Sequence, residues 1–171
     1  FERGLLPKEA FFAHIRSLIT AESPAPAAPT DEAIAGAWNS FLAGVPRYKL
    51  RQLQELKKTY RILLLSNTNE LHWDWALLHD FTQEGHTPAD YFDDIYLSFR
   101  LHLAKPAPEI FAEVIRRSGI LPEETLFIDD SPANCRAAEA FGIRTFTPPE
   151  RADWASGLFP GLCGSWAGAP H

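Results

Sequence analysis

Two adjacent acidic residues, Asp129 and Asp130, follow directly after the apolar stretch Leu126–Ile128. Such a stretch is typical of a buried strand, so the sequence places paired carboxylates at the carboxyl end of a strand, where α/β proteins bind ligands. Carboxylate oxygens are ligands that Mg²⁺ prefers, usually together with water and substrate phosphate. The pair therefore indicates a divalent metal site. The alternative is structural: Asp129 or Asp130 would cap the helix expected over residues 132–141, because Asp and Ser are favoured caps.

A second apolar stretch, which begins at Arg61, ends in the polar residues Ser66, Asn67, Thr68 and Asn69. A junction between a strand and a helix offers a hydroxyl group and free backbone N–H groups to an anion. This segment is therefore a candidate phosphate-binding site. The alternative is that these polar residues serve only to cap the next helix.

Lys105 is the third candidate, and Pro106 and Pro108 follow it closely. Proline restricts the backbone, so the lysine lies in a rigid turn from which its ammonium group can face a phosphate. Most lysines are merely solvated, and each of the three features is weak alone. Their order is more specific: a strand that ends in a hydroxyl residue, then Lys-Pro, then Asp-Asp with Asn134 four residues after the pair.

With these motifs in this order and spacing, the chain resembles the haloacid dehalogenase-like hydrolase superfamily. Its members are mostly Mg²⁺-dependent phosphatases with a Rossmann-like core. Residues 63–67 resemble the second motif of that family, the Lys-Pro pair resembles the third, and the Asp-Asp pair with Asn134 in a supporting position resembles the fourth. The resemblance covers roughly residues 1–147.

The resemblance implies a role for each motif residue. Ser66 and the backbone of Asn67 would bind the phosphoryl group that is transferred, and Lys105 would neutralise charge on the nucleophile and the phosphate. Asp130 and Asp129 would hold Mg²⁺ as the cofactor. The dehalogenase branch of the family uses no metal and has serines at the two acidic positions, so the pair favours a phosphatase.

The first motif of that family, an apolar strand that ends in Asp-x-Asp, has no counterpart in this chain. In the family it supplies the aspartate nucleophile and the aspartate general acid/base. Asp93 and Asp94 precede an apolar stretch, Asp74 lies in a Trp-rich helix, and Asp31 follows a proline-rich loop. The chain contains no Met and begins at Phe1. We therefore expect an upstream strand at the centre of the sheet in the working protein, either joined to this chain or supplied as a cleaved fragment.

Strands that alternate with helices predict an α/β fold with a parallel, Rossmann-like sheet covered on both faces. Residues 1–60 are expected to form a helical cap, residues 61–147 the α/β core, and residues 148–171 a C-terminal tail without readable periodicity. The predicted helices lie near residues 7–20, 31–42, 46–60, 70–80, 107–118 and 132–141, and the predicted strands near residues 61–66, 94–98, 125–129 and 143–146.

Charge and composition exclude several classes of partner. The formal net charge of −6 and the pI near 5.5 argue against nucleic acid or an anionic membrane surface as the main partner. No apolar run approaches the ~20 residues of a membrane span, so the cytoplasm is the default location. The two cysteines, Cys135 and Cys163, give no disulfide framework and are expected to be free thiols.

Aromatic and histidine side chains near the motifs raise separate questions. Trp73 and Trp75 cannot share one face of a helix, so one is expected in the core and the other either exposed or in contact with the cap. His102 stands three residues before Lys105, where related sequences usually carry glycine. The bulky side chain puts the local backbone course before the lysine in question.

The sequence therefore predicts a Mg²⁺-dependent phosphomonoester hydrolase that acts on a small phosphorylated metabolite. By resemblance, the reaction has two steps: an upstream aspartate attacks phosphorus and forms an aspartyl-phosphate, which water then hydrolyses. One alternative is a non-catalytic relative that binds a ligand or partner through a residual metal site. A less favoured alternative is a 2-haloacid dehalogenase, whose activity would survive removal of divalent metal.

Overall fold

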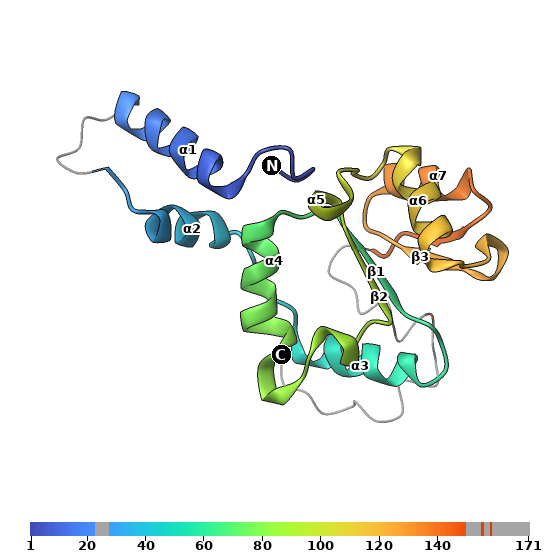
Figure 1. Cartoon of the computed structure of the whole chain (residues 1–171). Coiled ribbons are helices and arrows are strands. Elements are labelled where there is room, and N and C mark those ends of the chain that lie inside the picture. Colours follow the sequence, from blue (N-terminus) through green and yellow to red (C-terminus); the bar gives the residue numbers. More distant parts are fainter. Residues whose placement is uncertain (23–27, 150–154, 156–157, 159–171) are drawn as a thin grey trace. The chain divides into compact units, whose positions relative to one another are not determined.

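Helices and short parallel strands alternate along the chain in the computed structural model (Figure 1), which describes residues 1–22, 28–149, 155 and 158. The chain divides into two compact units. The first joins Phe1–Pro46 to Leu63–Ala104, and the second joins Arg47–Ile62 to the described residues from Lys105 onward. Each unit contains one parallel pair of strands.

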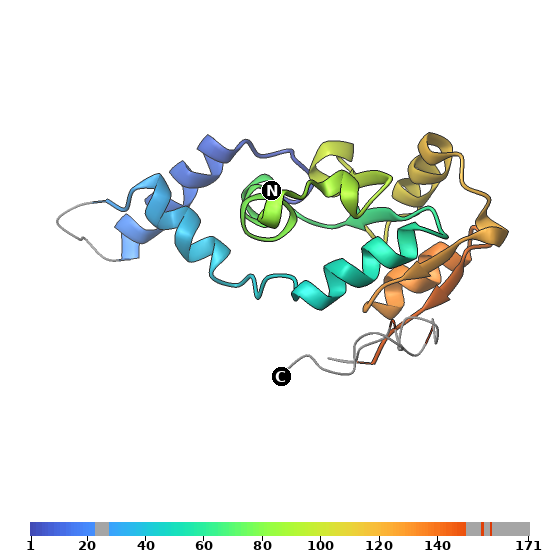
Figure 2. The ribbon, with the colours of Figure 1, turned by 90° about the horizontal axis from the view of Figure 1, so that it is seen from below.

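The first unit begins with two helices, α1 (Lys8–Glu22) and α2 (Asp31–Asn39), which lie side by side (Figures 1 and 2). Thr30 caps α2, because its side chain accepts a hydrogen bond from the backbone N–H of Ala33 at 3.2 Å. Both helices contribute to an apolar cluster that also includes a residue of α4 (Glu70–Ala76), a helix later in the first unit. The buried members of this cluster are Phe11, Phe12, Ile34 and Leu71.

The strands of the first unit are β1 (Leu63–Ser66) and β2 (Asp94–Leu97), which pair in parallel. Parallel strands need a long crossover connection. The one-turn helix α5 (Ser98–Leu101) follows β2 directly. The crossover contains four helical segments, which are α4 (Glu70–Ala76), a π-helical turn (Leu77–Phe81) and two 3₁₀ turns (Gln83–Gly85 and Pro88–Asp90).

The second unit contains a parallel pair made of β3 (Leu126–Ile128) and β4 (Arg144–Phe146). The helix α7 (Pro132–Glu139) connects these strands and contacts both of them. It also packs on α6 (Pro108–Ser118), the helix that precedes β3. The helical segments of this unit are α3 (Arg47–Lys57), α6 (Pro108–Ser118), a 3₁₀ turn (Pro122–Glu124) and α7 (Pro132–Glu139).

Local sequence sets the bounds of α6. Pro108 occupies its first turn, where the missing N–H costs nothing, and Gly119 ends it with a left-handed φ of 65°. Ile110 and Phe111 are buried on its inner face. The ring of Phe111 meets that of Phe127 edge to face, with 5.6 Å between centroids, and this contact attaches α6 to β3.

The predicted elements are confirmed, with bounds that shift by a few residues. The helix expected to reach residue 42 ends at Asn39, and the helix expected over 46–60 spans Arg47–Lys57. Among the described residues the strands form two separate parallel pairs rather than one hydrogen-bonded sheet. The upstream central strand stays a prediction, and so do the domain limits at residues 60 and 147.

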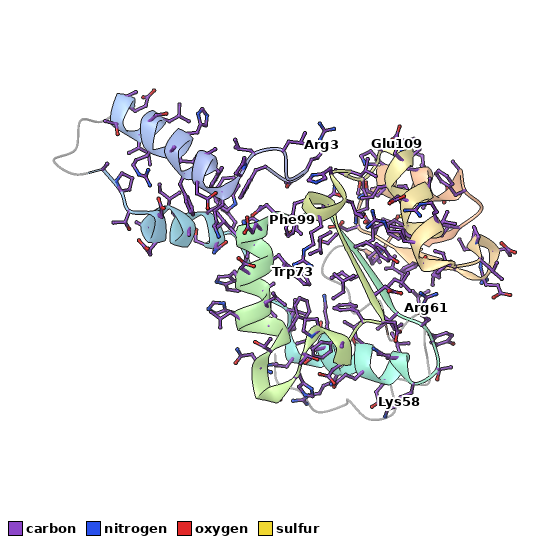
Figure 3. The ribbon with its side chains drawn as sticks, in the orientation of Figure 1. Arg3, Lys58, Arg61, Trp73, Phe99 and Glu109 are labelled. Carbon is purple, nitrogen blue, oxygen red and sulfur yellow. The ribbon has the colours of Figure 1, made fainter. Side chains whose placement is uncertain are left out.

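One tryptophan of α4 lies in the core as predicted, whereas the other is not exposed. Trp73, which is labelled in Figure 3, is 5% exposed. Its ring packs against that of Phe81, with 5.7 Å between centroids. Trp75 is half-buried, and its ring stacks on that of the exposed His79 with 4.4 Å between centroids. Cys135 is a free, buried thiol as predicted, whereas the predicted free thiol of Cys163 lies outside the described residues, as does most of the predicted tail.

The lengths of the described helices can be compared with the length needed to cross a membrane. At 15 residues, α1 is the longest helix in the described part of the chain. None of the helices described here has both the length and the apolar character needed to cross a membrane.

Candidate active site

The ends of β1 and β2 stand opposite each other, because Ser66 pairs with Leu97 in the register of the two strands. The strands are parallel, so the segments that begin at Asn67 and Ser98 leave from the same edge of the pair. This carboxyl edge is where parallel sheets bind ligands. The predicted phosphate-binding segment therefore lies at the ligand-binding edge of its strand pair.

The polar residues 66–69 do not all cap the helix that follows them. Asn69 caps α4, because its side-chain oxygen accepts a hydrogen bond from the backbone N–H of His72 at 3.1 Å. The capping alternative is therefore confirmed for Asn69. The hydroxyl group of Ser66 caps nothing and makes no hydrogen bond to another described residue. That hydroxyl group is available to an anion at the end of β1.

Lys105 and Asp129 form a buried ion pair in the second unit. Lys105 Nζ donates a hydrogen bond to Asp129 Oδ2 at 2.7 Å, and the two side chains are 8% and 7% exposed. The same ammonium lies 5.5 Å from the centroid of the Phe127 ring, a distance at which an aromatic face attracts a cation. Lys105 is therefore held in place rather than freely solvated.

The Asp129 carboxylate is also held on its other oxygen. Oδ1 accepts hydrogen bonds from the backbone N–H of Ser131 and from Nδ2 of Asn134, both at 2.9 Å. Burial raises the pKa of Asp129, but the hydrogen bonds from Lys105, Ser131 and Asn134 outweigh burial and lower the pKa below its ordinary 3.8. Asp129 is therefore a fixed anion.

We expect this carboxylate to make stability depend on pH under acid conditions. Folding lowers the pKa of Asp129, so its charge stabilises the folded state above the unfolded-state pKa of 3.8, and this contribution is lost as the pH falls through the lower, folded-state pKa. Asp129→Asn removes the titrating group. In urea unfolding, the wild type should lose more unfolding free energy than the variant between about pH 5 and pH 1. Equal losses would contradict the lowered pKa.

Asp130 has a different environment from its neighbour. It is exposed and makes no hydrogen bond or ion pair with another described residue. Neither Asp129 nor Asp130 is the N-cap residue of α7, because Ser131 occupies that position, so the capping alternative is wrong for both. Protein donors therefore hold Asp129, whereas the carboxylate of Asp130 faces solvent.

The acidic pair fits the requirements of a bound magnesium ion. Within the described ranges, no three side chains of His, Cys, Asp or Glu gather as a metal-binding group. A site with many protein ligands is not needed, because Mg²⁺ usually binds one or two carboxylates and fills its other positions with water and substrate phosphate. A solvent-facing carboxylate next to a fixed one meets that requirement.

The structure brings some of the predicted site residues together. Within the second unit, Lys105 and Asn134 each donate a hydrogen bond to Asp129, and Asp130 is adjacent in sequence. Ser66 and Asn67 belong to the first unit, and their proximity to the lysine stays a prediction.

Sequence reasoning missed Ser98, which is 0% exposed. Its hydroxyl group accepts a hydrogen bond from the backbone N–H of Thr68 at 2.9 Å. The position of Thr68, two residues after Ser66, is thereby fixed by the segment that follows β2. A serine directly after an apolar strand was the signal that singled out Ser66, and the same signal is present at Ser98.

A family model for haloacid dehalogenase-like hydrolases matches residues 9–142, which is most of the chain. The chain belongs to this family. The resemblance seen in the motifs is confirmed, and so is the α/β fold class.

Relatives of this haloacid dehalogenase-like hydrolase include a D-ribitol-5-phosphate phosphatase from Bacteroides thetaiotaomicron. The two proteins are 43% identical over 122 residues, which are 71% of this chain and 59% of the relative. The chain thus spans less than two thirds of the length of that relative.

Solved structures give the same family. A haloacid dehalogenase family enzyme from Bacteroides thetaiotaomicron, in complex with magnesium and inorganic phosphate, is 43% identical with a TM-score of 0.86. The match covers 92% of this chain and 76% of that enzyme. A predicted hydrolase of the family from Porphyromonas gingivalis is 33% identical with a TM-score of 0.81, over 95% of this chain and 76% of that one.

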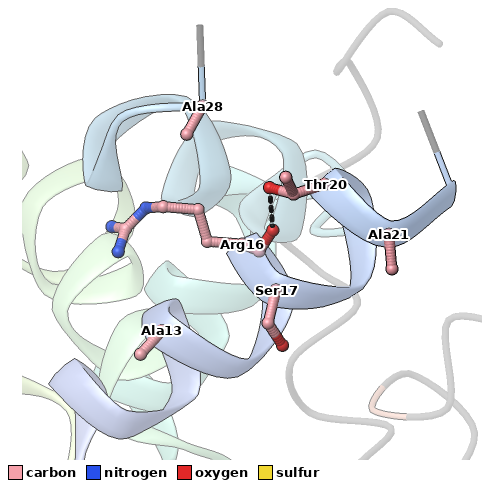
Figure 4. A pocket seen from close by; sticks show the side chains of 6 residues that line it. All are labelled: Ala13, Arg16, Ser17, Thr20, Ala21 and Ala28. Carbon is pink, nitrogen blue, oxygen red and sulfur yellow. Dashed lines mark hydrogen bonds between the residues drawn. The ribbon is translucent and has the colours of Figure 1, made fainter. Parts of the chain in front are cut away.

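A shallow hollow of about 520 Å³ lies beside α1 in the haloacid dehalogenase-like chain (Figure 4). It is lined by Ala13, Arg16, Ser17, Thr20, Ala21 and Ala28. The Thr20 hydroxyl group is already used, because it donates a hydrogen bond to the Arg16 carbonyl oxygen at 2.8 Å. None of the predicted site residues lines this hollow, so it is not part of the candidate active site.

Proposed function

We propose that this protein is a Mg²⁺-dependent phosphomonoester hydrolase that acts on a small phosphorylated metabolite through an aspartyl-phosphate intermediate. The observation that carries the proposal is the buried Lys105–Asp129 ion pair beside the exposed carboxylate of Asp130. The family relationship supports it, because a protein 43% identical to this chain is a phosphatase and an enzyme equally similar binds magnesium and inorganic phosphate.

Phosphoryl transfer requires mainly positioning and compensation of charge. In the proposal, the Lys105 ammonium neutralises negative charge on the phosphoryl oxygens and on the nucleophile. As the family resemblance implies, the Ser66 hydroxyl and the Asn67 backbone N–H donate hydrogen bonds to phosphoryl oxygens. Asp130 is the direct metal ligand, with the carboxylate of Asp129 beside it. When bound, Mg²⁺ supplies further positive charge at the phosphoryl oxygens.

The nucleophile is proposed to come from an Asp-x-Asp motif, which this sequence does not contain. Its first aspartate attacks phosphorus in line, so that an acyl phosphate forms and the alcohol leaves with a proton from the second aspartate. Water then attacks the acyl phosphate and releases inorganic phosphate. The residues of this chain hold the phosphoryl group during both steps.

D-ribitol 5-phosphate is the first substrate to test, because the phosphatase that is 43% identical to this chain is named for it. We propose a phosphorylated polyol or sugar as the substrate class, with the predicted cap over residues 1–60 contacting the part of the substrate remote from phosphorus. The cytoplasmic location stays a prediction.

The proposal is tested by release of inorganic phosphate from the complete purified protein. With Mg²⁺, kcat/KM for D-ribitol 5-phosphate should exceed that for p-nitrophenyl phosphate by about 10-fold or more, because contacts remote from phosphorus add to transition-state binding. Addition of EDTA should abolish turnover of both compounds.

Other outcomes would contradict the proposal and identify the alternative. Release of halide from a 2-haloacid that survives EDTA would indicate a dehalogenase. Absence of any turnover in a folded protein that still binds Mg²⁺ would indicate a non-catalytic binding protein.

A further inference from the structure

We propose that Ser98 and His102 form a clamp on residues Glu2–Gly4, and that His102 is a positioning residue that fixes where the chain enters the cap helix α1. Its link to catalysis rests on the proposed hydrolase function. All of these residues belong to the first compact unit.

Ser98 makes the first contact of the clamp. Its Oγ lies 2.6 Å from the Glu2 carbonyl oxygen and 2.9 Å from the Thr68 carbonyl oxygen, and it accepts a hydrogen bond from the Thr68 N–H. A hydroxyl group has a single proton, so it donates to one carbonyl at a time. The 2.6 Å distance favours Glu2. Because Ser98 is fully buried, this hydrogen bond is shielded from competing water.

His102 makes the second contact. Its Nδ1 lies 2.9 Å from the Arg3 carbonyl oxygen, which accepts a hydrogen bond, so Nδ1 is the donor. The backbone of His102 is left-handed, with φ 58°. A residue other than glycine is uncommon in this conformation, which explains why glycine would be the ordinary choice here. The imidazole supplies a contact that glycine could not make.

At Gly4, the third contact of the clamp, the backbone of the N-terminal segment approaches the backbone of Phe99 directly. The φ of Gly4 is 63°, and a Cβ atom at this position would lie 2.1 Å from the Phe99 carbonyl oxygen and 3.2 Å from His102 Nδ1. Only glycine satisfies both constraints. Arg3 and Phe99 are labelled in Figure 3, in the segments that meet at this point.

The clamped segment is attached to the cap as well. The ring of Phe1 stacks on the ring of Phe11 in α1, with 4.4 Å between centroids and an interplanar angle of 2°. The segment thus has an apolar contact with the cap and polar contacts with the residues that follow β2. Because Ser98 also binds Thr68, the clamp connects the cap entry to the loop that contains the proposed phosphate-binding residues.

His102→Gly tests the clamp without disturbing the backbone. Glycine keeps the left-handed conformation and removes the imidazole. His79→Ala is the matched control, because His79 also contacts a backbone carbonyl oxygen in the first unit, that of Trp75, but lies outside the clamp. Both variants should fold, and thermal unfolding measured by circular dichroism checks this.

Trypsin provides a readout that does not depend on activity. Arg3 is exposed, and the bond between Arg3 and Gly4 is a trypsin site that the clamp protects. Cleavage requires local opening, so loss of one hydrogen bond should speed cleavage by about 3- to 10-fold in His102→Gly. Mass spectrometry of the chain that begins at Gly4 measures this rate, with cleavage after the exposed Lys58 as an internal reference.

Steady-state kinetics test the link to catalysis. If the clamp positions the cap on the remote part of the substrate, His102→Gly should raise KM for D-ribitol 5-phosphate by about 3- to 10-fold and leave kcat within about 2-fold. His79→Ala should change neither value.

The outcomes separate the clamp from the proposed function. Cleavage after Arg3 that is no faster in His102→Gly than in wild type would overturn the clamp. Faster cleavage with an unchanged KM would overturn the positioning role. A wild type that hydrolyses no phosphoester would refute the proposed function, while the trypsin result would still decide the clamp.

Discussion

Asp130→Asn is expected to reduce phosphate release by about 100-fold or more, since loss of one preorganised charge at a reacting group costs about that much. Asparagine keeps the size of the side chain and removes the charge that is proposed to bind Mg²⁺. The effect should be on catalysis alone, because Asp130 is exposed and has no partner among the described residues. Phosphate release at several Mg²⁺ concentrations measures it.

Asp74→Asn is the matched control for this prediction. Asp74 is exposed on α4 and lies outside the candidate site. The control should keep the wild-type rate and Mg²⁺ dependence, and both variants should unfold at the wild-type temperature. An Asp130→Asn variant with nearly normal turnover would show that this carboxylate does not hold the metal.

Lys105→Met should impair both activity and stability. The substitution removes the ammonium that compensates phosphoryl charge, so kcat should fall by about 100-fold or more. It also leaves Asp129 buried without its cation, and breaking a buried ion pair costs about 3–5 kcal/mol. Urea unfolding and phosphate release measure the two effects separately.

The double variant Lys105→Met with Asp129→Asn separates the two roles of the lysine. Neutral residues in place of both charges leave no unpaired buried ion, so stability should recover toward the wild-type value. Activity should stay low. A double variant as unstable as Lys105→Met would contradict the explanation by an unpaired charge, and recovery of activity would contradict the catalytic role of Lys105.

Elements with a strong local signal were predictable from sequence. The apolar stretches before Ser66 and Asp129 become β1 and β3, and the bounds of α6 follow from Pro108 and Gly119. The motif order also predicted the family correctly. These features depend on residues close together in the chain, for which periodicity and capping rules are sufficient.

The remaining features depend on contacts between distant segments. Asp129 and Asp130 are neighbours with the same side chain, and what distinguishes them is that Asp129 accepts hydrogen bonds, among them one from Lys105, which is 24 residues away. The contact between His102 and the Arg3 carbonyl oxygen was equally hidden, because the two residues are 99 positions apart. The helix α5 could not be predicted, because four residues are too few to show the periodic spacing of apolar residues that indicates a helix.

Lys105, Asp129 and Asp130 are proposed to form part of a metal-dependent phosphatase centre. The most direct test is the initial rate of phosphate release from D-ribitol 5-phosphate by the complete protein, measured with Mg²⁺ and with EDTA. Turnover should require Mg²⁺ in the wild type and be lost in Asp130→Asn. Turnover that persists at the same rate with EDTA, or that is unchanged in Asp130→Asn, would contradict the proposal.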